Sequence, residues 1–126
     1  MKVFMIVDDS PVIRKVTRRI LEDMGYAVAE AEDGVDGLEK CDHTMPDAVM
    51  VDWDMPRMGG VEFITELKSR PAAADTKILF CTSEVNLSEM MKAKRAGAHG
   101  YVIKPFTRSI LQQSFTENGI ELPTAA

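Results

Sequence analysis

Short hydrophobic runs recur along the chain, and each is followed at once by polar residues. Four of them, at 3–7, 48–51, 78–81 and 101–103, show no alternation of apolar and polar positions. Runs of this kind are typical of strands that are fully buried in a parallel sheet. A weaker strand is predicted at 26–31, between the first two runs.

Helical patterns lie between the predicted strands. The clearest begins at Ser10, a residue type that caps helices, and at Pro11, which suits the first helical position. Gly25 marks its end. Further helices are predicted at 35–41, 61–69, 87–96 and 107–118.

The first of these helices is predicted to be amphipathic, with one face toward the core and a basic face apart from it. Its hydrophobic positions are Val12, Ile13, Val16, Ile20 and Leu21, and its basic positions are Arg14, Lys15, Arg18 and Arg19.

Strand and helix alternate five times, which predicts an α/β fold. Because crossovers between parallel strands are right-handed, the sheet should be parallel with helices on both faces. We assign residues 1–119 to this one domain and expect no output domain. Residues 120–126, which include Pro123, carry little to bury and are expected to form a short frayed tail.

Composition agrees with one globular domain: 126 residues, of which 45% are hydrophobic and 28% charged. The net charge of -5 argues against nucleic acid or anionic lipid as a partner. The first apolar run ends at Asp8 and Asp9, which suits neither a secretory signal nor a membrane span, so we expect a cytoplasmic location. Cys41 and Cys81 lack metal or disulfide spacing and are expected to be reduced core residues.

The polar residues that follow the strands carry the candidate chemistry. Asp8 and Asp9 follow the first predicted strand, Asp52 the third, Thr82 the fourth and Lys104 the fifth. The carboxyl ends of parallel strands lie along one edge of the sheet, where ligands bind. Residues far apart in the sequence are therefore expected to converge there.

Three carboxylates in one crevice need a positive partner, since two unit charges ~4 Å apart cost about 4 kcal/mol at an effective dielectric of about 20. Mg²⁺ meets this need because it binds one or two carboxylates and accepts phosphate oxygens. Lys104 adds a point charge suited to a phosphoryl oxygen. Asp52 is the candidate nucleophile, which would give an aspartyl-phosphate, and Gly59 and Gly60 allow the backbone to approach a ligand.

Four motifs occur in a fixed order on these predicted elements: VDDS at 7–10, DWDMPRMGG at 52–60, TS at 82–83 and GYVIKPF at 100–106. On these motifs the chain resembles the receiver domains of response regulators in two-component signalling. The resemblance spans nearly the whole chain. In size and layout the chain is similar to the stand-alone chemotaxis regulators.

The resemblance implies a flavodoxin-like (βα)5 fold, a doubly wound parallel five-stranded sheet of order 2-1-3-4-5. It implies that Asp9 and Asp52 bind Mg²⁺ directly and that Asp8 binds it through a water. The backbone carbonyl of Asp54 would supply another ligand. The Lys104–Pro105 peptide would be cis.

The same resemblance implies a phosphorylation switch rather than a conventional enzyme. The chain, expected to be a monomer, would catalyse transfer from a histidine kinase or histidine phosphotransfer protein to its own Asp52, and later dephosphorylation. Thr82 would hydrogen-bond the phosphoryl group and Lys104 would pair with it. Tyr101 would turn inward when Thr82 moves. The face made by the fourth helix, fifth strand and fifth helix would then bind a downstream target.

In receivers a kinase or phosphotransfer helix docks beside the first helix. The basic residues there therefore have two interpretations, a solvated face or a contribution to partner choice. They are Arg14, Lys15, Arg18 and Arg19.

Two other functions stay open. Asp52 and Asp54 match the short signature of haloacid-dehalogenase-type phosphatases, but those enzymes have further acids downstream, whereas here the partner acids lie upstream. The other function is a degenerate receiver that binds partners without phosphorylation. The effects of Asp54 and Glu84 on phosphoryl lifetime stay open. His43, in a predicted loop, and His99 are interpreted as surface histidines.

Overall fold

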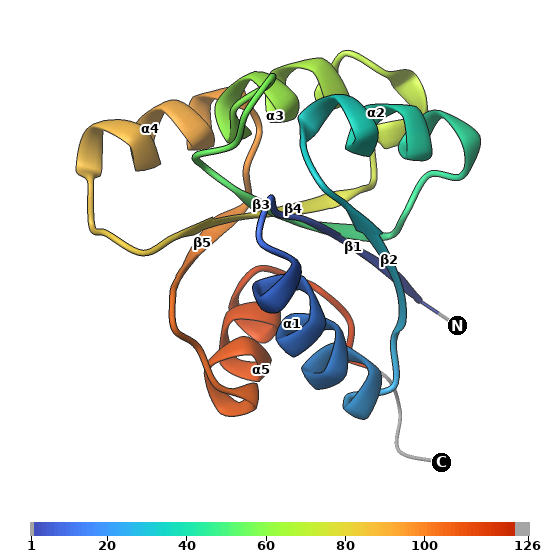
Figure 1. Ribbon diagram of the computed structural model, residues 1–126, viewed down its shortest axis with the longest axis vertical. Coiled ribbons are helices and arrows are strands. Elements are labelled where there is room, and N and C mark those ends of the chain that lie inside the picture. The colour runs from blue at the N-terminus through green and yellow to red at the C-terminus, as the bar shows by residue number, and fades with distance from the viewer. Residues whose placement is uncertain (1, 123–126) are drawn as a thin grey trace.

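The structure is a computed structural model that describes residues 2–122. A parallel five-stranded sheet of order β2-β1-β3-β4-β5 forms its centre, as predicted. Figure 1 shows α1 and α5 on one face of the sheet and α2, α3 and α4 on the other. The elements are β1 (Val3–Val7), α1 (Pro11–Asp23), β2 (Ala27–Ala31), α2 (Gly34–His43), β3 (Ala48–Asp52), α3 (Gly60–Lys68), the 3-10 helix η1 (Pro71–Ala73), β4 (Lys77–Thr82), α4 (Leu87–Ala96), β5 (Gly100–Ile103) and α5 (Arg108–Glu117).

Each face of the sheet has its own hydrophobic core. Beneath α2, α3 and α4 the core includes Val51, Phe63 and Phe80. Beneath α1 and α5 it includes Phe4 and Phe115, whose rings stack with centroids 4.9 Å apart. Because both faces are covered, β1, β3 and β4 are apolar without alternation except at strand ends, where Asp52, Lys77 and Thr82 lie.

Local sequence signals set the element boundaries, which differ from the predicted ones by at most two residues. The hydroxyl of Ser10 accepts a hydrogen bond from the backbone N–H of Ile13 at 3.3 Å and caps α1. Gly25, with a φ of 101°, stops that helix. The predicted loop position of His43 was wrong, since it is the last residue of α2, but its side chain is exposed as predicted. Within residues 2–122 no helix is both long and apolar enough to cross a membrane.

The prediction that the fifth strand is fully buried was wrong. Tyr101 is 52% exposed, although Val102 beside it is buried. The reason is position, because β5 is the edge strand of the sheet and has a neighbour on one side alone. The sequence of the strand does not carry this information.

The predicted hydrophobic face of α1 was also partly wrong. Val12 is 70% exposed and Val16 is 54% exposed, whereas Thr17 and Leu21 are buried. Successive helix positions differ by about 100°, so the stripe through Thr17 and Leu21 leaves Val12 and Val16 to one side. Val12 and Val16 therefore lie on the side of α1 away from the sheet and remain exposed.

The described part of the predicted tail is attached to the domain rather than frayed. Ile120 is buried in the core beneath α1 and α5. The hydroxyl of Tyr26 donates a hydrogen bond to the backbone carbonyl of Glu121 at 2.9 Å. These contacts correct the prediction for Ile120 and Glu121, and residues 123–126 lie outside the described residues.

The two cysteines are buried and unpaired, as predicted. Burial raises the pKa of the Cys41 thiol to about 11 and that of Cys81 to about 12. Both thiols are therefore protonated and poorly nucleophilic at neutral pH.

Candidate functional site

The strand ends that carry the candidate residues lie level with one another. Val7 pairs with Val51 across β1 and β3, so Asp8 and Asp52 follow at the same height. On the other side, Thr82 at the end of β4 pairs with Ile103, the residue before Lys104. The parallel register therefore brings these side chains to one edge of the sheet.

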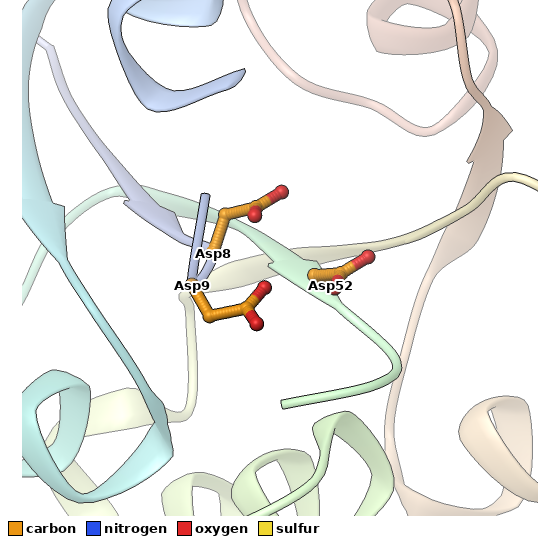
Figure 2. A group of neighbouring side chains, drawn as sticks. All are labelled: Asp8, Asp9 and Asp52. Carbon is orange, nitrogen blue, oxygen red and sulfur yellow. The ribbon is translucent and has the colours of Figure 1, made fainter. Parts of the chain in front are cut away.

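Three carboxylates meet at this edge. One oxygen from each of Asp8, Asp9 and Asp52 lies within 4.8 Å of the other two. Figure 2 shows the three side chains projecting side by side from the ends of β1 and β3. Asp8 is buried, Asp52 is half-buried and Asp9 is exposed, so the group runs from the protein interior to solvent.

Lys104 joins two of the three carboxylates. Its Nζ donates to Oδ2 of Asp8 at 2.7 Å and to Oδ1 of Asp52 at 2.9 Å. The other oxygen of Asp8 accepts the backbone N–H of Ser10 at 2.9 Å, which ties the acid to the start of α1. The Lys104–Pro105 peptide is cis, as the resemblance implied.

The electrostatics of the site follow from burial and from the excess of acids. Burial is the main cause that raises the pKa of Asp52, and the charges of Asp8 and Asp9 raise it further against the opposing effect of Lys104. Burial lowers the pKa of Lys104, but its hydrogen bonds to Asp8 and Asp52 outweigh that effect and raise it overall. Lys104 is therefore held as a cation.

The donor set fits a hard divalent cation. Three carboxylates against one ammonium leave an excess of two negative charges, and all the available ligand atoms are oxygens. Mg²⁺ prefers ligands of this kind. Asp54, the fourth residue expected at the metal, lies two positions past Asp52 with an exposed side chain.

Thr82 and Tyr101, the expected switch residues, lie on neighbouring strands. Thr82 is buried, and its hydroxyl donates to the backbone carbonyl of Glu84 at 2.9 Å while accepting the N–H of Glu84 at 3.2 Å. Tyr101 points outward from β5. No hydrogen bond links these two side chains, so the coupling that the resemblance implies stays a prediction.

A groove of about 780 Å³ lies on the face made by α4, β5 and α5. Apolar side chains on this face are exposed, with Leu87 and Met91 on α4, Tyr101 on β5 and Ile110 on α5. This is the face to which the resemblance to receiver domains assigns the binding of a downstream target.

The basic residues of α1 divide into two pairs. Arg14 Nε lies 3.2 Å from Glu30 Oε1, and Arg18 Nη1 lies 2.7 Å from Glu30 Oε2. Lys15 and Arg19 are exposed. Arg14 and Arg18 thus serve an internal ion-pair network, which leaves Lys15 and Arg19 on the outer side of the helix.

Sequence reasoning assigned no role to Glu30, the counter-ion of these arginines. A single acid in the otherwise apolar strand β2 was the available signal.

The predicted reason for the glycines after Asp52 was also incomplete. A Cβ on Gly60 would lie 2.6 Å from the carbonyl oxygen of Asp52, so Gly60 makes room for the backbone of the chain itself.

Comparisons with known proteins agree with this geometry. The model of the response regulator receiver domain family matches residues 4–116. The chain is 34% identical over 111 residues to chemotaxis protein CheY1 of Helicobacter pylori, which covers 86% of this chain and 90% of that protein. It is 32% identical over 110 residues to chemotaxis protein CheY of Pseudomonas aeruginosa, covering 86% of this chain and 89% of that protein.

The fold has a similarly extensive match among solved structures. Chemotaxis response regulator CheY4 of Vibrio cholerae superposes with a TM-score of 0.88 at 32% sequence identity. The match covers 94% of this chain and 98% of that one.

Proposed function

The chain belongs to the response regulator receiver domain family, and on that premise we propose that it is a phosphorylation-activated signalling switch with Asp52 as its phosphoacceptor. One observation carries this proposal. Asp8, Asp9 and Lys104, from separate ends of the sequence, converge on Asp52 at one edge of the sheet. A surface aspartate without a role in catalysis does not need this set of neighbours.

Asp52 is the nucleophile of the proposed transfer. Its carboxylate oxygen forms the new bond to phosphorus while the bond from phosphorus to the nitrogen of a donor histidine breaks, and the electron pair leaves with the imidazole. The donor is a histidine kinase or a histidine phosphotransfer protein. Lys104, which already lies 2.9 Å from Asp52, then pairs with a phosphoryl oxygen.

Mg²⁺ supplies neutralisation of the phosphoryl oxygens when it is bound. Asp9 and Asp52 would hold it directly, Asp8 through a water, and Asp54 through its backbone carbonyl. The pocket residues thus do the positioning, which is why the chain promotes its own phosphorylation and is not a conventional enzyme.

Thr82 links the pocket to the output face. Its hydroxyl donates to the carbonyl of Glu84, so that bond must break before the hydroxyl can donate to a phosphoryl oxygen. The segment between β4 and α4 would change with it. Tyr101 then turns inward, and the groove between α4, β5 and α5 becomes the binding face for a downstream protein.

The phosphodonor docks beside α1 in this proposal. Lys15 and Arg19 are exposed on that helix, whereas Arg14 and Arg18 are paired with Glu30. Val12 and Val16 add exposed apolar surface to the same helix. We therefore assign the contribution to partner choice to Lys15 and Arg19.

Mass spectrometry after incubation with acetyl phosphate tests the proposal. The wild-type chain with Mg²⁺ should gain one phosphoryl group, and Asp52→Asn should gain none. Asp54→Asn, which alters an exposed acid two positions away but keeps its backbone carbonyl, is the matched control and should still gain the group. Equal modification of wild type and Asp52→Asn would contradict the assignment.

A further inference from the structure

The loop between β3 and α3 is tied to the start of α2 by an ion pair. Nε and Nη2 of Arg57, in this loop, each lie 2.7 Å from Oδ2 of Asp33. Asp33 is the N-cap of α2. We call this pair the Asp33–Arg57 latch. It joins the loop that follows β2 to the loop that follows β3, and these two strands flank β1 in the sheet.

Asp33 is held in position to make this contact. Its side chain is 6% exposed, and its Oδ1 accepts the backbone N–H of Asp36 at 2.8 Å, so Oδ2 remains for the guanidinium. Burial opposes ionisation of Asp33, but the hydrogen bond from Asp36 and the charge of Arg57 outweigh it and lower the pKa. The carboxylate is therefore charged when it meets Arg57.

The backbone at Arg57 needs such a restraint. Its φ is 65°, in the left-handed region that side chains other than glycine seldom adopt. The N–H of Met58 donates to the carbonyl of Pro56 at 2.7 Å, which folds the chain tightly around Arg57. Met58 also packs so closely over Gly34 that a Cβ there would lie 2.7 Å from its Cγ. Both the ion pair and this packing hold the loop against α2.

We propose that Arg57 is a positioning residue for the Mg²⁺ site and acts through the Asp33–Arg57 latch. The inference rests on the proposed function and adds a residue to it. The loop that Arg57 restrains includes Asp54, and the N–H of Gly60 closes it by donating to the carbonyl of Trp53 at 3.0 Å. Mg²⁺ demands near-ideal octahedral geometry. A loop free to relax at Arg57 would move the Asp54 carbonyl away from Asp52 and weaken the site.

Two substitutions remove the Asp33–Arg57 latch while they keep the backbone conformation and the helix cap around it. Arg57→Gly leaves the buried Asp33 carboxylate without its guanidinium, but glycine suits a φ of 65°, so the two effects should roughly offset and thermal stability should change little. Asp33→Asn keeps a good N-cap for α2 and removes the charge that meets Arg57. Arg57→Lys should retain part of the Mg²⁺ affinity, because it keeps the positive charge but cannot contact Asp33 through two nitrogens.

The test is a Mg²⁺ titration followed by the fluorescence of Trp53, the one tryptophan of the chain. Arg57→Gly and Asp33→Asn should each raise the half-saturating concentration roughly 3- to 10-fold, below the roughly 10- to 100-fold typical of groups bonded directly to a metal ligand. The double variant should match the single ones, since both remove the same contact. Without metal, amide hydrogen exchange at Gly60 should become faster in both.

Arg70→Gln is the matched control. Arg70 makes a similar forked pair with Asp42, with Nε at 2.7 Å and Nη2 at 3.2 Å, near the other ends of α2 and α3. This variant should leave Mg²⁺ affinity unchanged. Wild type without Mg²⁺ binding would overturn the proposed function and this inference with it. Two results would overturn the inference alone. One is the same Mg²⁺ affinity in wild type, Arg57→Gly and Asp33→Asn. The other is a loss of Mg²⁺ affinity in Arg70→Gln as large as that in the latch variants.

Discussion

Nζ of Lys104 lies 2.9 Å from Oδ1 of Asp52, although 52 positions separate the two residues. The same ammonium donates to Asp8 at 2.7 Å, so it lies between two acids and reduces their mutual repulsion. The residue proposed to pair with the phosphoryl group is therefore also the counter-ion of the unmodified pocket. Its removal should affect stability as well as chemistry.

Lys104→Met is expected to destabilise the metal-free protein by about 1–3 kcal/mol. This is less than the ~3–5 kcal/mol typical of a broken buried pair, because the side chains of Lys104 and Asp52 keep 16% and 13% of their surface in contact with water. Mg²⁺ should reduce the deficit, since it binds the carboxylates left without Lys104. Urea denaturation with and without Mg²⁺ measures both effects.

The control for this variant is Lys92→Met, which removes an exposed pair with Glu89. Its effect should stay within about 0.5 kcal/mol. A deficit in Lys104→Met that Mg²⁺ leaves unchanged would contradict the electrostatic explanation.

Gly60→Ala is expected to destabilise the protein and distort the pocket. The new Cβ would lie 2.6 Å from the carbonyl oxygen of Asp52 and 2.8 Å from the Cα of Trp53, and backbone atoms have little freedom to move. Overpacking of this kind typically costs about 1–3 kcal/mol. Gly59→Ala is the matched comparison, because its nearest neighbour would be 3.5 Å away, and it should change stability by about 1 kcal/mol or less. Similar denaturation midpoints for the two variants would argue against the clash.

Local sequence signals predicted most of the fold. Apolar runs bounded by polar residues and the cap at Ser10 are properties of neighbouring residues, which is why the elements were found to within two positions. The order of the strands was implied by resemblance, because the run at 101–103 does not show that it forms an edge. The exposure of Tyr101 was missed for the same reason.

The acidic site was predictable because the parallel sheet brings strand ends together. Asp8, Asp9, Asp52 and Lys104 needed nothing more than their positions after the strands. The ion pairs around the site were not predictable in this way. The partners of Glu30 and of Arg57 come from other elements, and the periodicity of one element does not reveal which residues of another it meets.

A double reversal, Lys15→Glu with Arg19→Glu, tests the docking side of α1. Both side chains are exposed, so the reversal should leave stability nearly unchanged while it slows phosphotransfer from the cognate histidine donor roughly 10-fold or more. Phosphorylation by acetyl phosphate, which needs no docking, should keep its rate. Equal slowing with both donors would contradict the assignment of Lys15 and Arg19 to docking of the phosphodonor.

Arg14→Glu is the contrasting variant. Arg14 lies against Glu30 and donates from Nη1 to the backbone carbonyl of Asp8 at 2.6 Å, so the reversal places like charges together and loosens the chain beside the pocket. It should lower stability by about 1 kcal/mol and slow phosphorylation by both donors. Thermal unfolding and parallel kinetics with the two donors distinguish this pattern from that of Lys15 and Arg19.

His99 should make stability depend on pH near neutrality. The predicted surface position of His99 is partly right, since the residue is half-buried, with Nδ1 accepting the backbone N–H of Ile78 at 3.0 Å. Burial lowers the pKa of His99 below its usual 6.5, and the nearby charges of Lys68 and Lys77 lower it further. A protonated ring would also have no lone pair for the Ile78 N–H.

The sign of the effect follows from proton binding. Between the lowered pKa of the folded protein and 6.5, the unfolded chain binds a proton at His99 that the folded protein does not. The contribution of His99 is therefore complete above about pH 6.5 and is lost as the pH falls toward the lower folded value. Melting temperatures between about pH 7.5 and 5.5 should fall less steeply in His99→Asn, whose Oδ1 can accept the Ile78 N–H without titrating in this range. Parallel curves for wild type and His99→Asn would show that protonation of His99 does not oppose folding.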